Sequence, residues 1–127
     1  MKIMIVEDEA VIRQGIRNIL EDITMHEIVI TEFDNVPDAW AYLKKDIPNL
    51  VITDIRMREM DGLTLIRKLR QLYAELPVII ISGHQDFEYA QQAIRYKVTD
   101  YLLKPIDRRE LLQLVMKIAD QLVPSTQ

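Results

Sequence analysis

Short apolar runs alternate along this chain with longer stretches in which apolar residues recur at the spacing of a helix. The runs are rich in Val and Ile and short enough for single strands. They predict five strands, at Ile3–Val6, Glu27–Phe33, Leu50–Thr53, Val78–Ser82 and Asp100–Leu103. The stretches between them predict helices at Asn35–Lys45, Gly62–Leu72, Phe87–Tyr96 and Arg108–Leu122, and an earlier helix carrying Ile12, Ile16, Ile19, Leu20 and Ile23 on one face.

Five strand–helix units in succession favour an α/β fold, a parallel sheet with helices on both faces. Near-continuous Val and Ile is what a sheet buried on both sides requires. The 127 residues amount to one domain, and 49% apolar and 28% charged residues are ordinary for a globular protein. The polar tail at 123–127 (VPSTQ) resembles the start of a linker, so we expect the domain to span 1–122.

Composition excludes several classes of function. There is no cysteine, which rules out disulfides and thiolate metal sites. No apolar run reaches the roughly 20 residues that cross a bilayer, and the N-terminus does not resemble a signal peptide. We therefore expect a cytoplasmic chain with no membrane partner. A net charge of −4 without a clustered basic stripe argues against direct binding to nucleic acid.

Candidate chemistry lies where the predicted strands end, the edge at which open α/β sheets bind their ligands. Every predicted strand except the second contributes, and the residues are Glu7 and Asp8, Asp54, Ser82, and Lys104. Clustered carboxylates repel one another unless a cation lies between them, and oxygen ligands suit Mg²⁺. A carboxylate beside Mg²⁺ can attack phosphorus, while a lysine and a hydroxyl stabilise the phosphoryl oxygens. Singly, each residue has an ordinary explanation, such as a helix cap for Asp8. The combination favours phosphoryl transfer.

Four segments carry a resemblance to a known family. IMIVEDE at 3–9, VITDIRMREMDGL at 51–63, VIIISG at 78–83 and DYLLKP at 100–105 resemble the receiver domains of bacterial two-component response regulators. The resemblance covers the chain to about Leu122 and implies a flavodoxin-like, doubly wound sheet of five parallel strands with five helices. It also implies a sensor histidine kinase as the partner that supplies the phosphoryl group.

The resemblance assigns roles residue by residue. Asp54 would accept the phosphoryl group. Asp8, Asp54 and the backbone carbonyl of Arg56 would ligate Mg²⁺, with Glu7 acting through metal-bound water. The switch hydroxyl, the phosphate-pairing lysine and the switch aromatic would be Ser82, Lys104 and Tyr101.

This sequence departs from the family pattern at three positions. Glu7 stands where Asp is frequent, Ser82 where Thr is commoner, and Arg58 where the family usually has Pro. The first two changes keep the carboxylate and the hydroxyl donor, whereas the third costs a loop some rigidity. His84 is interpreted as a solvated loop residue. The stretch Ser82–Ile94 followed by DYLLKPI is similar to receivers coupled to AraC-type helix-turn-helix domains, which implies transcription control and DNA contact only through an output domain absent from this chain.

Three alternatives are weighed against this interpretation. A haloacid-dehalogenase-like phosphohydrolase needs a second Asp two residues after its nucleophile, where this chain has Arg56, so no turnover of outside substrates is expected. A flavodoxin needs a hydroxyl- and glycine-rich loop where Glu7 and Asp8 would repel phosphate. A receiver-like interaction module that is never phosphorylated stays open. So does the choice between a phosphorylation-dependent homodimer and release of an output domain; the candidate dimer face carries Gln91, Arg95, Asp100 and Arg109.

Overall fold

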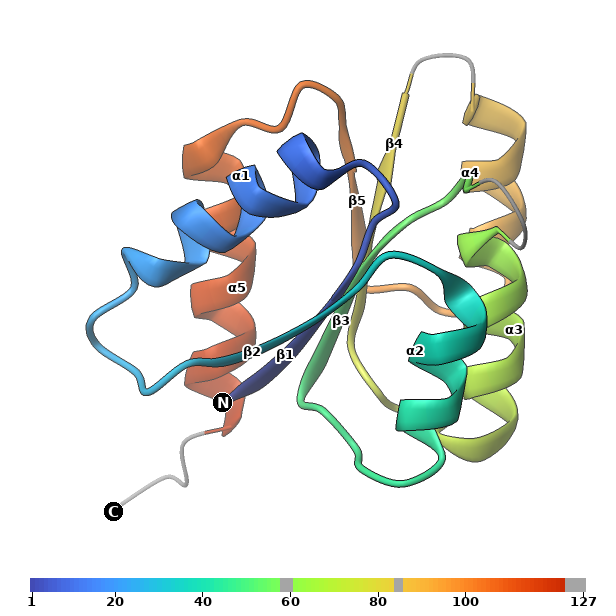
Figure 1. The fold of residues 1–127 in the computed structure, drawn as a ribbon, viewed down its shortest axis with the longest axis horizontal. Coiled ribbons are helices and arrows are strands. Elements are labelled where there is room, and N and C mark those ends of the chain that lie inside the picture. The colour runs from blue at the N-terminus through green and yellow to red at the C-terminus, as the bar shows by residue number, and fades with distance from the viewer. Residues whose placement is uncertain (58–60, 84–85, 123–127) are drawn as a thin grey trace.

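The computed structural model describes residues 1–57, 61–83 and 86–122. The interpretations of Arg58, of His84 and of the tail at 123–127 lie outside the described residues. Strands and helices alternate along the chain (Figure 1). The strands are β1 (Lys2–Val6), β2 (Val29–Phe33), β3 (Leu50–Asp54), β4 (Val78–Ser82) and β5 (Asp100–Leu103). The helices are α1 (Ala10–Glu21), α2 (Val36–Leu43), α3 (Gly62–Leu72), α4 (Phe87–Ile94) and α5 (Arg108–Leu122).

The five strands form one parallel sheet in the order β2-β1-β3-β4-β5. The chain runs from β1 outward to β2, and then returns past β1 to place β3 on its other side. The direction of strand addition therefore reverses between β1 and β3, and their carboxyl ends lie side by side, with Val6 opposite Thr53. Such a reversal point is where open α/β sheets bind their ligands.

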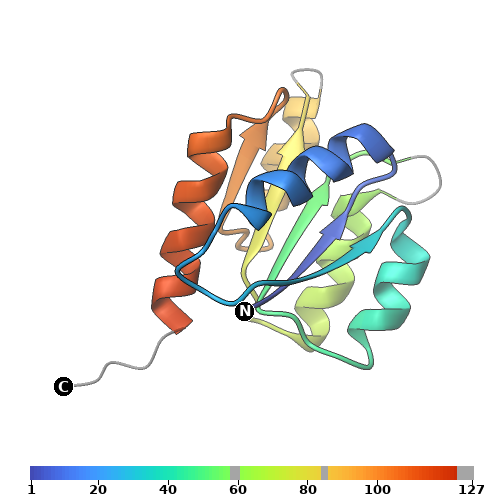
Figure 2. The same ribbon diagram turned by 60° about the vertical axis from the view of Figure 1, so that its left-hand side comes forward.

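Helices cover both faces of the sheet, α1 and α5 on one and α2, α3 and α4 on the other (Figures 1 and 2). Successive side chains along each strand point to opposite faces of the sheet, so each strand contributes to two separate cores. In β1, Ile3 and Ile5 pack with the α1–α5 cluster, whereas Met4 and Val6 pack with the α2–α4 cluster. All residues of β3 and β4 are buried. The prediction of a flavodoxin-like α/β fold is confirmed.

Three predicted boundaries were wrong by two residues: the start of β2 and the ends of α4 and α2. β2 begins at Val29, not Glu27, and Val29 pairs with Lys2, the first residue of β1. α4 ends at Ile94, not Tyr96. After Ile94 the backbone N–H groups of Arg95, Tyr96 and Lys97 each donate to the carbonyl three residues earlier, so the α-helical bonding pattern ends there.

α2 ends at Leu43, two residues before the predicted limit, and its large apolar residues Trp40 and Leu43 differ in burial. Leu43 is fully buried. Trp40 is partly buried against the α2–α4 core, with the ammonium groups of Lys44 and Lys68 within 6 Å of its ring. Within the described part of the chain, no helix combines the length and the apolar character needed to span a membrane.

Candidate functional site

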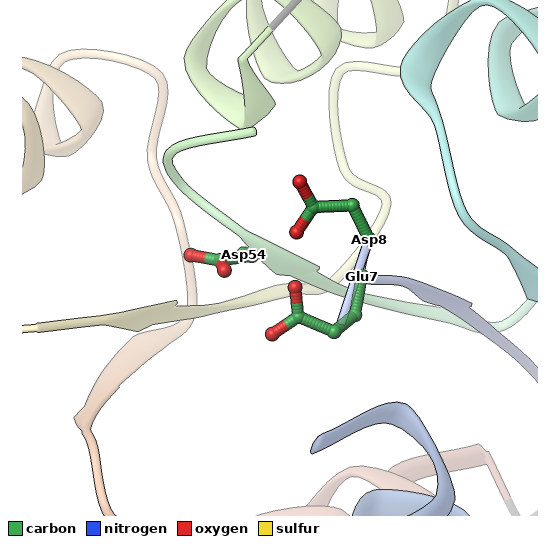
Figure 3. Close-up of side chains that lie close together, drawn as sticks. All are labelled: Glu7, Asp8 and Asp54. Atoms are coloured by element: carbon green, nitrogen blue, oxygen red, sulfur yellow. The ribbon is translucent and has the colours of Figure 1, made fainter. Parts of the chain in front are cut away.

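Three carboxylates meet at the reversal point of the sheet. Glu7 and Asp8 follow β1, Asp54 ends β3, and one carboxylate oxygen of each lies within 4.8 Å of the others. Figure 3 shows the three side chains side by side at these neighbouring strand ends. Glu7 and Asp8 therefore lie next to Asp54 although about 50 positions separate them in the chain. This proximity was predicted from their places at the carboxyl ends of the strands.

Glu7 carries the strongest electrostatic signature in this cluster. Its side chain is fully buried, and burial raises its pKa to about 8, with further increases from a hydrogen bond with Asp54 and from the Asp54 charge. The charge of Lys104 acts in the opposite direction. The Oε1 atom of Glu7 is buried and accepts no hydrogen bond from the described residues. A buried carboxylate oxygen in this position is costly unless a cation or a donor reaches it.

The donor set fits a hard divalent cation. Three carboxylates provide only oxygen ligands, and the buried Oε1 of Glu7 accepts no hydrogen bond from the described residues, although Lys104 Nζ lies 3.5 Å away. α1 begins at Ala10, and its N-cap position is held by Glu9, not by Asp8; Glu9 makes no side-chain cap bond. Arg13 instead fixes the turn after β1 by donating to the main-chain carbonyl of Glu7 at 2.7 Å.

Lys104 brings a positive charge to the same edge. Its Nζ lies 2.7 Å from Asp54 Oδ2 and 3.5 Å from Glu7 Oε1. Burial works against its charged form, but the hydrogen bond and charge of Asp54, with the charges of Glu7 and Glu9, outweigh it and raise the pKa of Lys104. The main-chain N–H of Lys104 donates to the carbonyl of Ser82 at 2.9 Å, which ties the end of β5 to the end of β4. Lys104 is therefore an ammonium group fixed beside Asp54 at neutral pH.

Ser82 and Tyr101 lie on the two strands beyond β3. Ser82, the last residue of β4, is 1% exposed, whereas Tyr101 on the edge strand β5 is 43% exposed. Tyr101 is therefore a surface aromatic and not part of either core. Leu102 packs with the α1–α5 cluster, and alternation along β5 directs Tyr101 to the α4 side. Alternation along β4, whose Ile80 packs in the α2–α4 cluster, directs Ser82 to the same side.

Two groups near the site were missed by sequence reasoning. Arg56 was considered for its backbone carbonyl; in the structure its N–H lies 3.3 Å from Asp54 Oδ1, and its guanidinium Nη1 lies 3.4 Å from Asp86 Oδ1. Asp86 is 5% exposed, and its other oxygen accepts the N–H of Gly83 at 3.0 Å. An acid directly before a predicted helix was the available signal, and it indicates a helix cap; Asp86 makes no such cap bond.

The chain matches known proteins over most of its length. Residues 3–116 match the profile of the response regulator receiver domain. The chain is 34% identical over 121 residues to the uncharacterized transcriptional regulatory protein YesN of Bacillus subtilis, and 39% identical over 111 residues to the transcriptional regulatory protein HptR of Staphylococcus aureus. The aligned regions are 95% and 87% of this chain but only 33% and 43% of those relatives.

Solved structures share the fold at comparable identity. The receiver domain of AraT, a response regulator from Geobacillus stearothermophilus, superposes with a TM-score of 0.83 at 37% identity, covering 95% of this chain and 94% of that one. A response regulator receiver protein from Pseudomonas putida gives a TM-score of 0.80 at 36% identity, covering 91% and 95%. With the family profile matched from β1 into α5, the chain belongs to the response regulator receiver domain family of two-component systems.

Proposed function

We propose that this chain is a phosphorylation-controlled receiver in which Asp54 accepts a phosphoryl group from a sensor histidine kinase. One observation carries the proposal. The carboxylate of Asp54 lies between the acidic pair Glu7 and Asp8 and the ammonium group of Lys104, 2.7 Å away. An acceptor carboxylate needs cationic groups beside it to receive a phosphoryl group, and this site combines a fixed cation with the ligands for another.

The transfer forms one bond and breaks one. A carboxylate oxygen of Asp54 donates an electron pair to phosphorus while the P–N bond of the kinase phosphohistidine breaks. The imidazole nitrogen keeps that pair and takes a proton from solvent, and Asp54 becomes an acyl phosphate. Lys104 then pairs with a phosphoryl oxygen, and the hydroxyl of Ser82 donates a hydrogen bond to another.

The metal is proposed to be Mg²⁺, held directly by Asp8, Asp54 and the backbone carbonyl of Arg56, with Glu7 acting through water. Two observations support this ligand set: Glu7 Oε1 is buried without a hydrogen bond from the described residues, and the three carboxylates lie close together. When bound, Mg²⁺ supplies positive charge that offsets the repulsion between the acceptor carboxylate and the phosphoryl oxygens. The side chains of Glu7 and Asp8 would hold the ion beside Asp54, Asp8 directly and Glu7 through water.

The output is proposed to be transcription control. The relatives YesN and HptR are transcriptional regulatory proteins, and the chain spans between a third and less than half of their length. We propose that residues 1–122 form the receiver, that 123–127 begin a linker, and that DNA contact belongs to an AraC-type output domain. We further propose that the receiver acts in the cytoplasm and turns over no outside substrate.

Incubation with acetyl phosphate and Mg²⁺, followed by intact-mass measurement, tests the acceptor. The parent protein should gain one phosphoryl group that is lost at alkaline pH, as an acyl phosphate is. Asp54→Asn should gain none. Asp34→Asn is the matched control, because Asp34 is an exposed acid that directly follows β2 at the same edge of the sheet. An adduct that persists in Asp54→Asn refutes the assignment, and a parent that gains no phosphoryl group would support the unphosphorylated interaction module.

A further inference from the structure

Two arginine side chains hold α4, one at each end. At its C-terminal end, Arg70 of α3 donates from Nε to the carbonyl of Tyr96 at 2.6 Å and from Nη2 to that of Lys97 at 3.1 Å. A third bond, from Nη1 to the carbonyl of Tyr73 at 3.0 Å, ties the same guanidinium to the end of α3. The Arg70 side chain thus fixes this end of α4 through main-chain carbonyls. These contacts lie far from Asp54, on the opposite edge of the sheet.

The N-terminal end of α4 is held through Asp86. Its Oδ2 accepts the N–H of Gly83 at 3.0 Å, and its own N–H donates back to the carbonyl of Gly83 at 3.1 Å. These reciprocal bonds join Asp86 to Gly83, the residue directly after Ser82. The Oδ1 atom of this nearly buried carboxylate lies 3.4 Å from Nη1 of Arg56. A carboxylate with 6% side-chain exposure requires such a partner, because an unpaired buried charge is strongly destabilising.

Arg56 connects the acceptor to Asp86. Its backbone N–H lies 3.3 Å from Asp54 Oδ1, while its guanidinium contacts Asp86 and lies 5.3 Å from the ring centre of Tyr89 on α4. A single residue thus reaches the acceptor with its main chain and α4 with its side chain. Among the described residues, this is the one ion pair between the segment after β3 and the segment after β4.

We propose that the Arg56–Asp86 ion pair is a latch that opposes phosphorylation, an inference that rests on the proposed function. It stabilises the conformation in which Lys104 bonds the free carboxylate of Asp54. A phosphoryl group on Asp54 needs hydrogen-bond donors from the carboxyl edge of the sheet. The N–H of Gly83 is the first backbone donor beyond β4. Asp86 already occupies that donor, and Arg56 keeps Asp86 in place. Opening the latch frees the Ser82–Gly83 segment and the adjacent end of α4.

Weakening the latch should favour the phosphoryl-bound conformation. A ligand that binds one of two conformations gains apparent affinity when the competing conformation loses stability. Beryllofluoride with Mg²⁺ is a phosphoryl mimic that attaches to a free aspartate. Loss of one charged, hydrogen-bonded pair at a half-exposed arginine should lower the dissociation constant of beryllofluoride by about three- to tenfold.

The test compares beryllofluoride affinity in four proteins by calorimetric titration: the parent, Arg56→Gln, Arg56→Lys and Arg67→Gln. Arg56→Gln should bind about three- to tenfold more tightly than the parent, by the same reasoning. Arg56→Lys keeps the charge and should fall between them. Arg67→Gln alters an exposed arginine of α3 and should match the parent. Equal or weaker affinity in Arg56→Gln overturns the latch.

A second measurement does not depend on phosphoryl chemistry. The Gly83 amide should exchange its hydrogen faster in Arg56→Gln than in the parent without beryllofluoride, because Asp86 is then held less firmly. Unchanged Gly83 exchange overturns the latch in any case. If the parent itself fails to bind beryllofluoride, the proposed function fails, and Gly83 exchange still decides whether Arg56 restrains Asp86 and its bond to Gly83. Thermal melts of each variant establish that it is folded.

Discussion

The α-carbon of Gly62 packs directly against the main-chain carbonyl of Asp54. A β-carbon at position 62 would lie 2.0 Å from that oxygen and 3.0 Å from Oγ1 of Thr53, which itself donates to the same carbonyl at 2.9 Å. Neither neighbour can withdraw, because one is backbone and the other is buried. The φ angle of Gly62 is not positive, so glycine is required here for space and not for its backbone freedom.

Gly62→Ala should therefore lower the free energy of unfolding by about 2–4 kcal/mol, the cost of overpacking against a rigid neighbour. Urea denaturation measures this change. Gly15→Ala is the matched control, because no atom lies within 4 Å of a β-carbon built at that exposed position of α1. There the better helix propensity of alanine should raise the free energy of unfolding by about 0.5–1 kcal/mol. Equal effects at the two positions would contradict the close approach.

Millimolar Mg²⁺ should raise the melting temperature of the parent protein, because a cation that binds only the folded state stabilises it by mass action. Asp8→Ala should lose most of that rise, since it removes one of the three clustered carboxylates. Asp34→Asn should keep it. Scanning calorimetry with and without Mg²⁺ provides the comparison. A full response to Mg²⁺ in Asp8→Ala would show that the ligand set is wrong.

The stability of the metal-free protein should decrease as pH rises from about 5 to about 8. In this range the folded protein retains the proton on Glu7, whose pKa is raised to about 8, while the unfolded chain has released it. Raising the pH through this window therefore costs stability, on the order of 1–3 kcal/mol from this group. Urea unfolding in the presence of a chelator at several pH values measures the slope. Glu7→Gln has no proton to lose and should flatten it; an unchanged slope would assign the pH dependence elsewhere.

Beryllofluoride with Mg²⁺ should change the surface formed by α4, β5 and α5. Ser82 and Tyr101 face the α4 side of the sheet, so movement of Ser82 toward the site should allow Tyr101, now 43% exposed, to turn inward. Amide chemical-shift changes should then extend from Ser82 to Tyr101 and into α4. Changes confined to the loops around Asp54 would mean that the site binds the anion without transmitting it.

Sedimentation of the same sample should show a shift from monomer to dimer. The candidate interface is the edge strand β5 with its exposed Tyr101 and Leu103, flanked by charges of both signs at Asp100 and Arg109 that can pair across a two-fold axis. Tyr101→Ala should weaken the dimer, whereas Val11→Ala, a change at a more exposed apolar residue on α1, should not. A protein that stays monomeric with beryllofluoride bound would instead favour release of an output domain.

The order of elements and the edge that carries the site were predictable from the chain alone. Burial acts on one side chain at a time, so runs such as Val78–Ser82 and the periodic stretch Gly62–Leu72 located their elements to the residue. Successive strand–helix units have few allowed connections, so the carboxyl ends of the strands had to share one edge. That rule places Glu7, Asp54 and Lys104 together without knowledge of any distance.

The remaining features depend on how segments distant in the chain pack against one another. The pKa of Glu7 arises from complete burial beside Asp54, which no local pattern encodes. The contact of Gly62 with the Asp54 carbonyl and the pairing of Arg56 with Asp86 each require a particular approach of one loop to another. Sequence periodicity reports which side of an element is buried but not the separation between elements, and steric contact, desolvation and charge pairing all change sharply over an ångström. Only the tertiary structure fixes those separations.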